Sequence, residues 1–141
     1  TGGSFGKELS EELSKIPFEF LQTYSFLTSK STKNQKIIQK YSDLYQITHA
    51  KEIVAPVGTA HAYDLIFLLA TAIKKIGHLD RPAIRDALEK IKSHEGLVKH
   101  YKPPFRPNHH DALSSDDLFL AKYDKRGNVI PVSIKTSDLL N

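Results

Sequence analysis

Residues 59–77 read TAHAYDLIFLLATAIKKIG and form the most apolar segment of the chain. One helical stripe of it is apolar, and further apolar side chains cover much of the remaining circumference; the stripe consists of Ala62, Leu65, Ile66, Leu69, Ile73 and Ile76. A helix that is apolar on so many sides must be covered by other elements. Its uninterrupted apolar run is about half of the roughly 20 residues that a membrane span needs. We therefore expect the central core helix of the protein.

Both ends of this stretch carry the residues that begin and end helices. Thr59 is a candidate N-cap, and Gly77 can adopt the left-handed conformation that closes a helix. Lys74 and Lys75 suit the negative C-terminal end of the helix dipole. The predicted helix therefore extends over residues 59–77.

Composition sets broad limits on the class of protein. With 141 residues and 40% hydrophobic residues, the chain has the size and the core of one ordinary domain. The net charge of +4 comes from 20 basic residues spread among 16 acidic ones, which is typical of a mixed solvated surface rather than a nucleic-acid-binding face. Cysteine is absent, so there is neither a disulfide nor a thiolate nucleophile. The chain has no initiator Met and no signal-peptide core, and we expect a processed or truncated product.

Further helices are predicted on both sides of the central one. Residues 7–16 have helical periodicity, and Pro17 ends that helix. Thr32 and Gln35 have the spacing of a capping box at the start of the next helix. After the central helix, Asp80 is the expected N-cap of another helix, and Pro82 lies in its first turn.

Strands are predicted near both ends of the chain. Residues 18–27 alternate and are rich in aromatics, with a slip at residues 20–21 that indicates a bulge or a change of sheet. Residues 96–101 form a short predicted strand, followed by a long Pro-rich loop. Residues 118–123 and 129–134 are predicted to pair as a hairpin, with Gly127 at a left-handed position of the turn. A frayed tail is expected over residues 136–141.

The sequence offers few candidates for chemistry. His109, His110 and Asp111 are metal-ligand types, but adjacent histidines on a loop rarely face one ion, so a hydrogen-bonded loop anchor is the favoured interpretation. His61 and Asp64 lie one helical turn apart and could form an acid–base pair. A carboxylate near a helix start, however, usually serves only to stabilise the helix through its dipole. No catalytic constellation is evident, so we expect no enzyme, no metal and no cofactor.

Four motifs, taken in order, resemble the C-terminal third of type I periplasmic solute-binding proteins, the branched-chain amino-acid receptors of ABC transporters. The first lies in the central helix, the second in the helix that follows it, the third in the predicted strand at residues 96–101 and the fourth in the C-terminal hairpin. They comprise Ala62-Tyr63-Asp64-Leu65 with residues 68–73, Asp80-Arg81 with residues 83–89, Glu95-Gly96-Leu97-Val98, and Tyr123-Asp124 with residues 127–132.

The resemblance implies an α/β fold of two lobes that close on a small ligand, with only its C-terminal portion present here. Residues 1–28 and 118–141 would belong to the second lobe and residues 29–117 to the first. The implied ligand contacts are Gly2, Gly3, Ser4 and Phe5 in a glycine-rich loop, with Thr59 and His61 at the start of the central helix. The implied location is periplasmic or extracellular, and the implied partner is a membrane permease. Strands that this chain lacks would cover the central helix, so we expect the isolated chain to self-associate.

Two departures from the family pattern concern the ligand. Lys99 stands where the family strand often ends in Gly, and no acidic residue accompanies the glycine-rich loop to hold a ligand ammonium. Another small polar or aromatic compound is therefore an alternative to an amino acid. Two further functions stay open: a ligand-sensing regulatory domain of the same fold, and a basic α/β interaction module motivated only by the charge.

Overall fold

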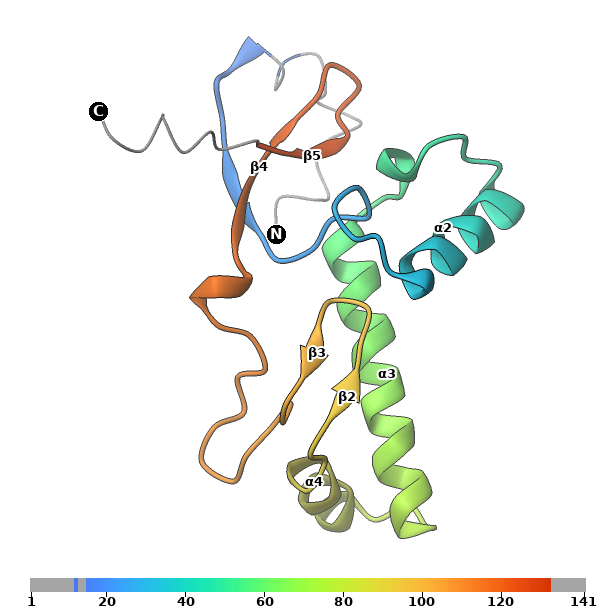
Figure 1. Ribbon diagram of the computed structural model, residues 1–141, viewed down its shortest axis with the longest axis vertical. Helices are drawn as coiled ribbons and strands as arrows, with labels where there is room; N and C mark the ends of the chain where they lie inside the picture. Colours follow the sequence, from blue (N-terminus) through green and yellow to red (C-terminus); the bar gives the residue numbers. More distant parts are fainter. Residues whose placement is uncertain (1–11, 13–14, 133–141) are drawn as a thin grey trace. The chain divides into compact units, whose positions relative to one another are not determined.

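The computed structural model describes Glu12 and residues 15–132 (Figure 1). The glycine-rich opening, most of the helix expected at residues 7–16 and the tail expected at residues 136–141 lie outside the described residues. The chain divides into two compact units, one formed by Thr1–Val57 with Leu118–Asn141 and the other by Gly58–Asp117. Each unit is described by itself, and the lobe boundaries expected from the sequence stay a prediction.

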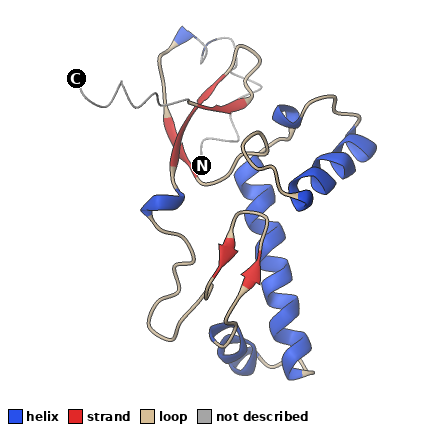
Figure 2. Cartoon of the chain, viewed as in Figure 1, coloured by secondary structure: helices blue, strands red, loops and turns tan. Residues whose placement is uncertain are grey.

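The first unit contains a small antiparallel sheet in the order β1-β4-β5 (Figure 2). Its strands are β1 (Phe20–Gln22), β4 (Phe119–Tyr123) and β5 (Val129–Pro131). The predicted strand at residues 18–27 is therefore too long. The chain leaves the sheet after Gln22 because Tyr24 and Phe26 turn inward: the Tyr24 hydroxyl donates to Asn34 Oδ1 over 2.5 Å, and Asn34 Nδ2 donates to the Phe26 carbonyl over 3.0 Å.

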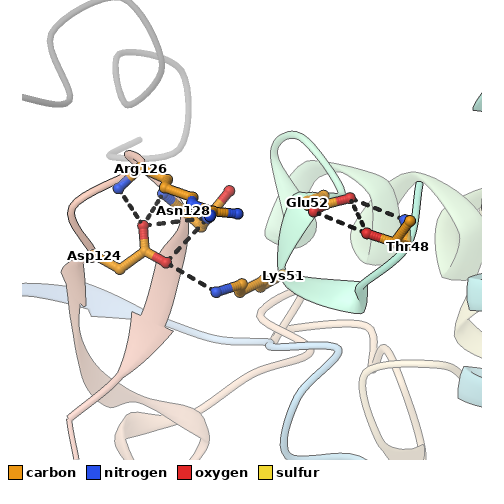
Figure 3. Close-up of polar contacts among 6 residues, drawn as sticks. All are labelled: Thr48, Lys51, Glu52, Asp124, Arg126 and Asn128. Atoms are coloured by element: carbon orange, nitrogen blue, oxygen red, sulfur yellow. Dashed lines mark hydrogen bonds and ion pairs between the residues drawn. The ribbon is translucent and has the colours of Figure 1, made fainter. Parts of the chain in front are cut away.

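The hairpin between β4 and β5 is confirmed, with Gly127 at φ 74°. The Asp124 carboxylate organises its turn by accepting from the backbone N–H groups of Arg126 and Asn128 at 2.8 and 3.0 Å (Figure 3). Lys51, from the 3-10 turn η1 (Ala50–Glu52), reaches the same carboxylate at 3.4 Å. Burial raises the pKa of Asp124, but the hydrogen bonds from Asn128, Arg126 and Lys51 outweigh that effect and hold it below its ordinary value.

Helix α2 (Thr32–Tyr45) also belongs to the first unit. Its N-cap is Ser31, whose side chain accepts from the backbone N–H of Asn34, so the capping box expected at Thr32 is wrong. Ser31 has extended backbone angles while Thr32 is already helical, which is the conformation that an N-cap requires.

The second unit contains α3 (Pro56–Ile76) from Gly58 onward, α4 (Arg81–Glu89), the strands β2 (His94–Glu95) and β3 (His100–Tyr101), and the 3-10 turn η2 (Ser115–Asp117). Helix α3 begins at Pro56, so Thr59 is not its N-cap; proline at the first helical position has a preset φ and no N–H to satisfy. Gly77 closes the helix at φ 77°, as predicted. Asp80 is the N-cap of α4 and accepts from the backbone N–H of Ala83 over 2.9 Å, which confirms that prediction.

The prediction of a single strand at residues 96–101 is wrong. The structure has a tight hairpin instead, in which β2 pairs with β3 and residues 96–99 form the turn. The Gly96 N–H donates to the Lys99 carbonyl over 3.0 Å and closes this turn. A two-residue strand on each side is too short for any periodicity to reveal it.

Four of the six residues in the stripe of α3 that the sequence predicted to be covered are exposed, and the other two, Ile73 and Ile76, are half-buried. Leu65, Ile66 and Leu69 are 55%, 64% and 43% exposed. The side chains that α3 buries are Ala60, Asp64, Leu68 and Ala72, because the β2–β3 hairpin packs on that narrower side (Figure 1). The expectation that other elements surround the helix is therefore not met within the described residues.

Helix α3 is also long and apolar enough to cross a membrane, judged by length and composition alone. The sequence interpretation counted only its apolar run and found it too short. One side of the helix nevertheless packs on protein, since Asp64 in its third turn is 1% exposed and is held by the hairpin. A soluble core helix passes the same length and composition test.

Candidate functional site

A buried polar cluster in the second unit surrounds the carboxylate of Asp64. One oxygen, Oδ1, accepts from the backbone N–H of Leu97. The other, Oδ2, accepts from the backbone N–H of Val98 and from the Tyr101 hydroxyl, both over 2.9 Å. All three donors are electrically neutral, and no Lys or Arg in the described part of the chain pairs with Asp64. The cluster therefore fixes the hairpin on α3 and leaves a buried negative charge there.

Gly96 makes the close approach of the hairpin to α3 possible. A Cβ atom at this position would lie 2.5 Å from Asp64 Oδ2 and 2.6 Å from Tyr101 Cε2. Burial is the largest cause, and the negative charge of Asp64 the next, that raises the pKa of Tyr101 well above its ordinary value. The hydroxyl therefore stays protonated and donates its hydrogen bond to Asp64. Sequence order alone gave no sign of this arrangement, since its partners lie 33 to 37 residues from Asp64.

A groove of about 360 Å³ opens beside this cluster, between α3 and the loop that follows β3. Its lining comes from α3, from Tyr101 in β3 and from the loop. The lining residues are His61, Asp64, Leu65, Leu68, Tyr101, Phe105, His110, Asp111, Ala112 and Leu113. These residues all belong to the second unit. The groove is therefore the candidate ligand-binding site, and it is hereafter called the α3 groove.

One rim of the α3 groove is held against α4 by a hydrogen bond between His110 and Glu89. His110 Nε2 lies 2.9 Å from Glu89 Oε1, and Arg85 Nη2 lies 3.0 Å from the same oxygen. The hydrogen bond from His110 is the main reason that the pKa of Glu89 lies below its ordinary value. The loop-anchor interpretation of the histidine cluster thus fits His110, while His109 pairs through its backbone with Arg106.

The residues predicted to contact a ligand are only partly brought together. His61 lines the α3 groove, whereas Thr59 lies in the first turn of α3 and is not among the lining residues. Gly2, Gly3, Ser4 and Phe5 lie outside the described residues. The structure gives Asp64 a structural role, because its carboxylate accepts three hydrogen bonds from the hairpin.

Phe105 and Tyr101 are groove residues that sequence reasoning missed. The aromatic residues flanking the Pro-Pro pair were a possible signal, because a Pro-rich loop with aromatics is stiff enough to present them. Among the described residues, no group of three or more His, Cys, Asp or Glu side chains could hold a metal ion.

The fold is similar to that of a solved periplasmic binding protein. The chain superposes on the crystal structure of a periplasmic binding protein type 1 from Bordetella pertussis Tohama I with a TM-score of 0.66 and 20% sequence identity. The match covers 89% of this chain and 36% of that protein, so the chain spans about a third of its length. At this identity the likeness shows the fold. No family model and no curated protein sequence matches the chain.

Proposed function

We propose that this chain is the C-terminal part of an extracytoplasmic solute-binding protein that delivers its ligand to an ABC transporter. The observation that supports the proposal is the fold likeness to a periplasmic binding protein over 89% of the chain. In such a protein, affinity comes from burying a small solute between two closing lobes while a few polar groups fix its orientation. The protein is a receptor for a small polar molecule, such as an amino acid, rather than an enzyme.

Two groups of residues contribute to ligand binding under this proposal. His61, on the rim of the α3 groove, and Thr59, in the first turn of α3, form one group. Gly2, Gly3, Ser4 and Phe5 form the other. The N-terminal turn of a helix presents backbone N–H groups, which suit a hydrogen-bond acceptor on the solute.

The test uses the full-length protein and begins with a thermal-shift screen of amino acids, small amides and small amines. A solute that binds the native state raises Tm as its concentration rises, as linkage requires. Isothermal titration with that solute then compares the wild type with Thr59→Ala and His61→Ala. We expect weaker binding in both variants with unchanged folding.

His78→Ala is the matched control for His61→Ala. His78 follows the other end of α3, is exposed, and contacts the Ile76 carbonyl at 2.9 Å. We expect wild-type affinity in this variant. Unchanged affinity in both the Thr59 and the His61 variant would remove α3 from the site, and a screen without any stabilising solute would count against the proposed function.

A further inference from the structure

The α3 groove differs in charge from the chain that carries it. The chain has 20 Lys and Arg residues and a net charge of +4, yet no Lys or Arg is among the residues that line the groove. Its lining includes two carboxylates, those of Asp64 and Asp111. The groove is therefore an electronegative site on a basic protein.

The two carboxylates have different roles. Asp64 is 1% exposed, and its oxygens are already occupied by Leu97, Val98 and Tyr101, so it contributes its charge rather than a free acceptor. Asp111 is exposed and makes no hydrogen bond or ion pair with another described residue. A cation in the groove can therefore bind Asp111 directly and be attracted by Asp64 through a low-dielectric wall.

The remaining surface of the groove suits a hydrocarbon or aromatic group. Leu65, Leu68 and Leu113 supply aliphatic contacts, and Phe105 supplies a ring. The Phe105 ring lies edge-on to His110, with the ring centroids 6.5 Å apart. An aromatic ring and a carboxylate that line one groove can bind an organic ammonium group, through cation–π attraction combined with an ion pair.

We infer that the α3 groove binds an organic amine, with the ammonium group at Asp111 and Phe105 and the apolar body on the leucines. The inference rests on the proposed solute-binding function and names the charge class of the solute. A carboxylate group on the ligand has no Lys or Arg to meet in the groove, and His110 is already engaged by Glu89. An amine without a carboxylate therefore fits better than a zwitterionic amino acid.

The test compares three probes of similar size and different charge: phenethylamine, 2-phenylethanol and 3-phenylpropanoate. Each is titrated calorimetrically into the full-length protein at pH 8, where ordinary imidazoles are neutral and the amine is charged. We expect phenethylamine to bind roughly tenfold more tightly than either other probe, because only it gains the attraction of both carboxylates. Equal or tighter binding of the alcohol or the anion would overturn the inference.

Two substitutions locate the interaction. Asp111→Asn keeps the shape of the side chain and removes its charge, and we expect roughly threefold weaker binding of phenethylamine, as for an exposed ion pair. Asp116→Asn is the matched control, since Asp116 is an exposed aspartate of η2 that does not line the groove. Loss of affinity in both variants, or in neither, would overturn the assignment of the ammonium to Asp111.

The results also separate this inference from the proposed function. In one outcome, a solute without a positive charge stabilises the protein and phenethylamine does not bind. This outcome supports the solute-binding function and overturns the inference that the ligand is an amine. Binding of phenethylamine that weakens in Asp111→Asn supports both. A protein that binds neither the probes nor any solute of the screen contradicts both.

Discussion

The carboxylate of Asp64 accepts a hydrogen bond over 2.9 Å from the backbone N–H of Val98, 34 residues further along the chain. This contact joins two of the four motifs that carry the family resemblance, the Tyr63-Asp64 pair of α3 and the Gly96-Leu97-Val98 turn. The two motifs are therefore one structural device: a buried carboxylate that holds the tip of a hairpin against a helix. Asp64 and its hydrogen-bond partner Tyr101 also line the α3 groove.

Gly96→Ala should destabilise the protein by about 1–3 kcal/mol, the usual cost of overpacking a core position. The new methyl group would overlap Asp64 Oδ2 and Tyr101 Cε2, so the carboxylate or the ring must move. Urea unfolding followed by circular dichroism measures the loss.

A second substitution shows whether the carboxylate is the group that moves. Tyr101→Phe in the wild type should cost about 1 kcal/mol, because it removes the hydroxyl donor to Asp64. In Gly96→Ala that cost should disappear. In Gly77→Ala it should persist, because a Cβ at Gly77 meets no atom within 4 Å and strains only the local backbone. Equal costs of Tyr101→Phe in all three backgrounds would contradict the clash.

Local signals in the sequence predicted local features of the fold. Asp80 as N-cap, Gly77 as helix terminator and Gly127 in the hairpin turn are each decided by neighbours within a few residues, and all three are confirmed. The role of Asp64 depends on partners more than 30 residues away, so no pattern around it could predict that role. Similarly, Pro56 and Thr59 are both acceptable near a helix start, and only the structure shows that the helix begins at Pro56.

The candidate site was predicted less completely than the fold. His61 was placed by analogy at the start of a helix, and the structure finds it in a groove. Phe105 was missed because a loop brings it to α3 without any periodicity that the sequence could display. The exposure of α3 follows from the family resemblance, which implies covering strands that this chain lacks, and not from the hydrophobic pattern. That pattern tells which side chains favour burial, but not whether a covering element is present in the chain.

Acid should weaken the fold through Asp117 and Asp124. Burial raises the pKa of Asp117, but hydrogen bonds from Lys99 and Ser114 outweigh burial, so the pKa lies below its ordinary value. The pKa of Asp124 is lowered by hydrogen bonds in the same way. A carboxyl whose folded-state pKa is depressed stabilises the protein above its unfolded-state value of about 4, and the effect is lost as pH falls through the lowered pKa. We expect a smaller free energy of unfolding at pH 3 than at pH 7.

Neutral variants provide the check on this pH dependence. Asp117→Asn and Asp124→Asn should each reduce the difference between the two pH values, and Asp116→Asn, at an exposed neighbouring position, should leave it unchanged. The prediction fails if the free energy of unfolding is the same at both pH values, or if the Asp116 variant alone removes the difference.

Adding zinc or nickel at moderate excess should leave Tm unchanged. His110 is engaged with Glu89 and anchors the loop, while His109 is exposed and pairs through its backbone with Arg106. A native-state metal site would raise Tm progressively with metal concentration. Such a rise, abolished in a His109→Ala, His110→Ala variant, would establish a metal site against this prediction.

The isolated 141-residue chain should self-associate through the exposed side of α3. Leu65, Ile66, Phe67 and Leu69 are each at least 43% exposed and lie within a single helical turn and a half. Soluble monomers rarely expose an apolar patch larger than a few hundred Å². Burying about 400 Å² at roughly 25 cal/mol per Å² corresponds to about 10 kcal/mol, which is comparable to the 5–15 kcal/mol that stabilise a whole domain. A two-fold dimer is the simplest way to cover such a patch.

Sedimentation equilibrium at micromolar concentration measures this association, and charge substitutions identify the surface. Ile66→Glu places a carboxylate within the patch and should shift the chain toward a monomer of 15.9 kDa. Lys74→Glu, at an exposed position two turns further along α3, should leave the association unchanged. If the unsubstituted chain is a clean monomer that melts cooperatively, then this segment tolerates its apolar helix face in water. In that case the argument that the helix needs a covering element is wrong.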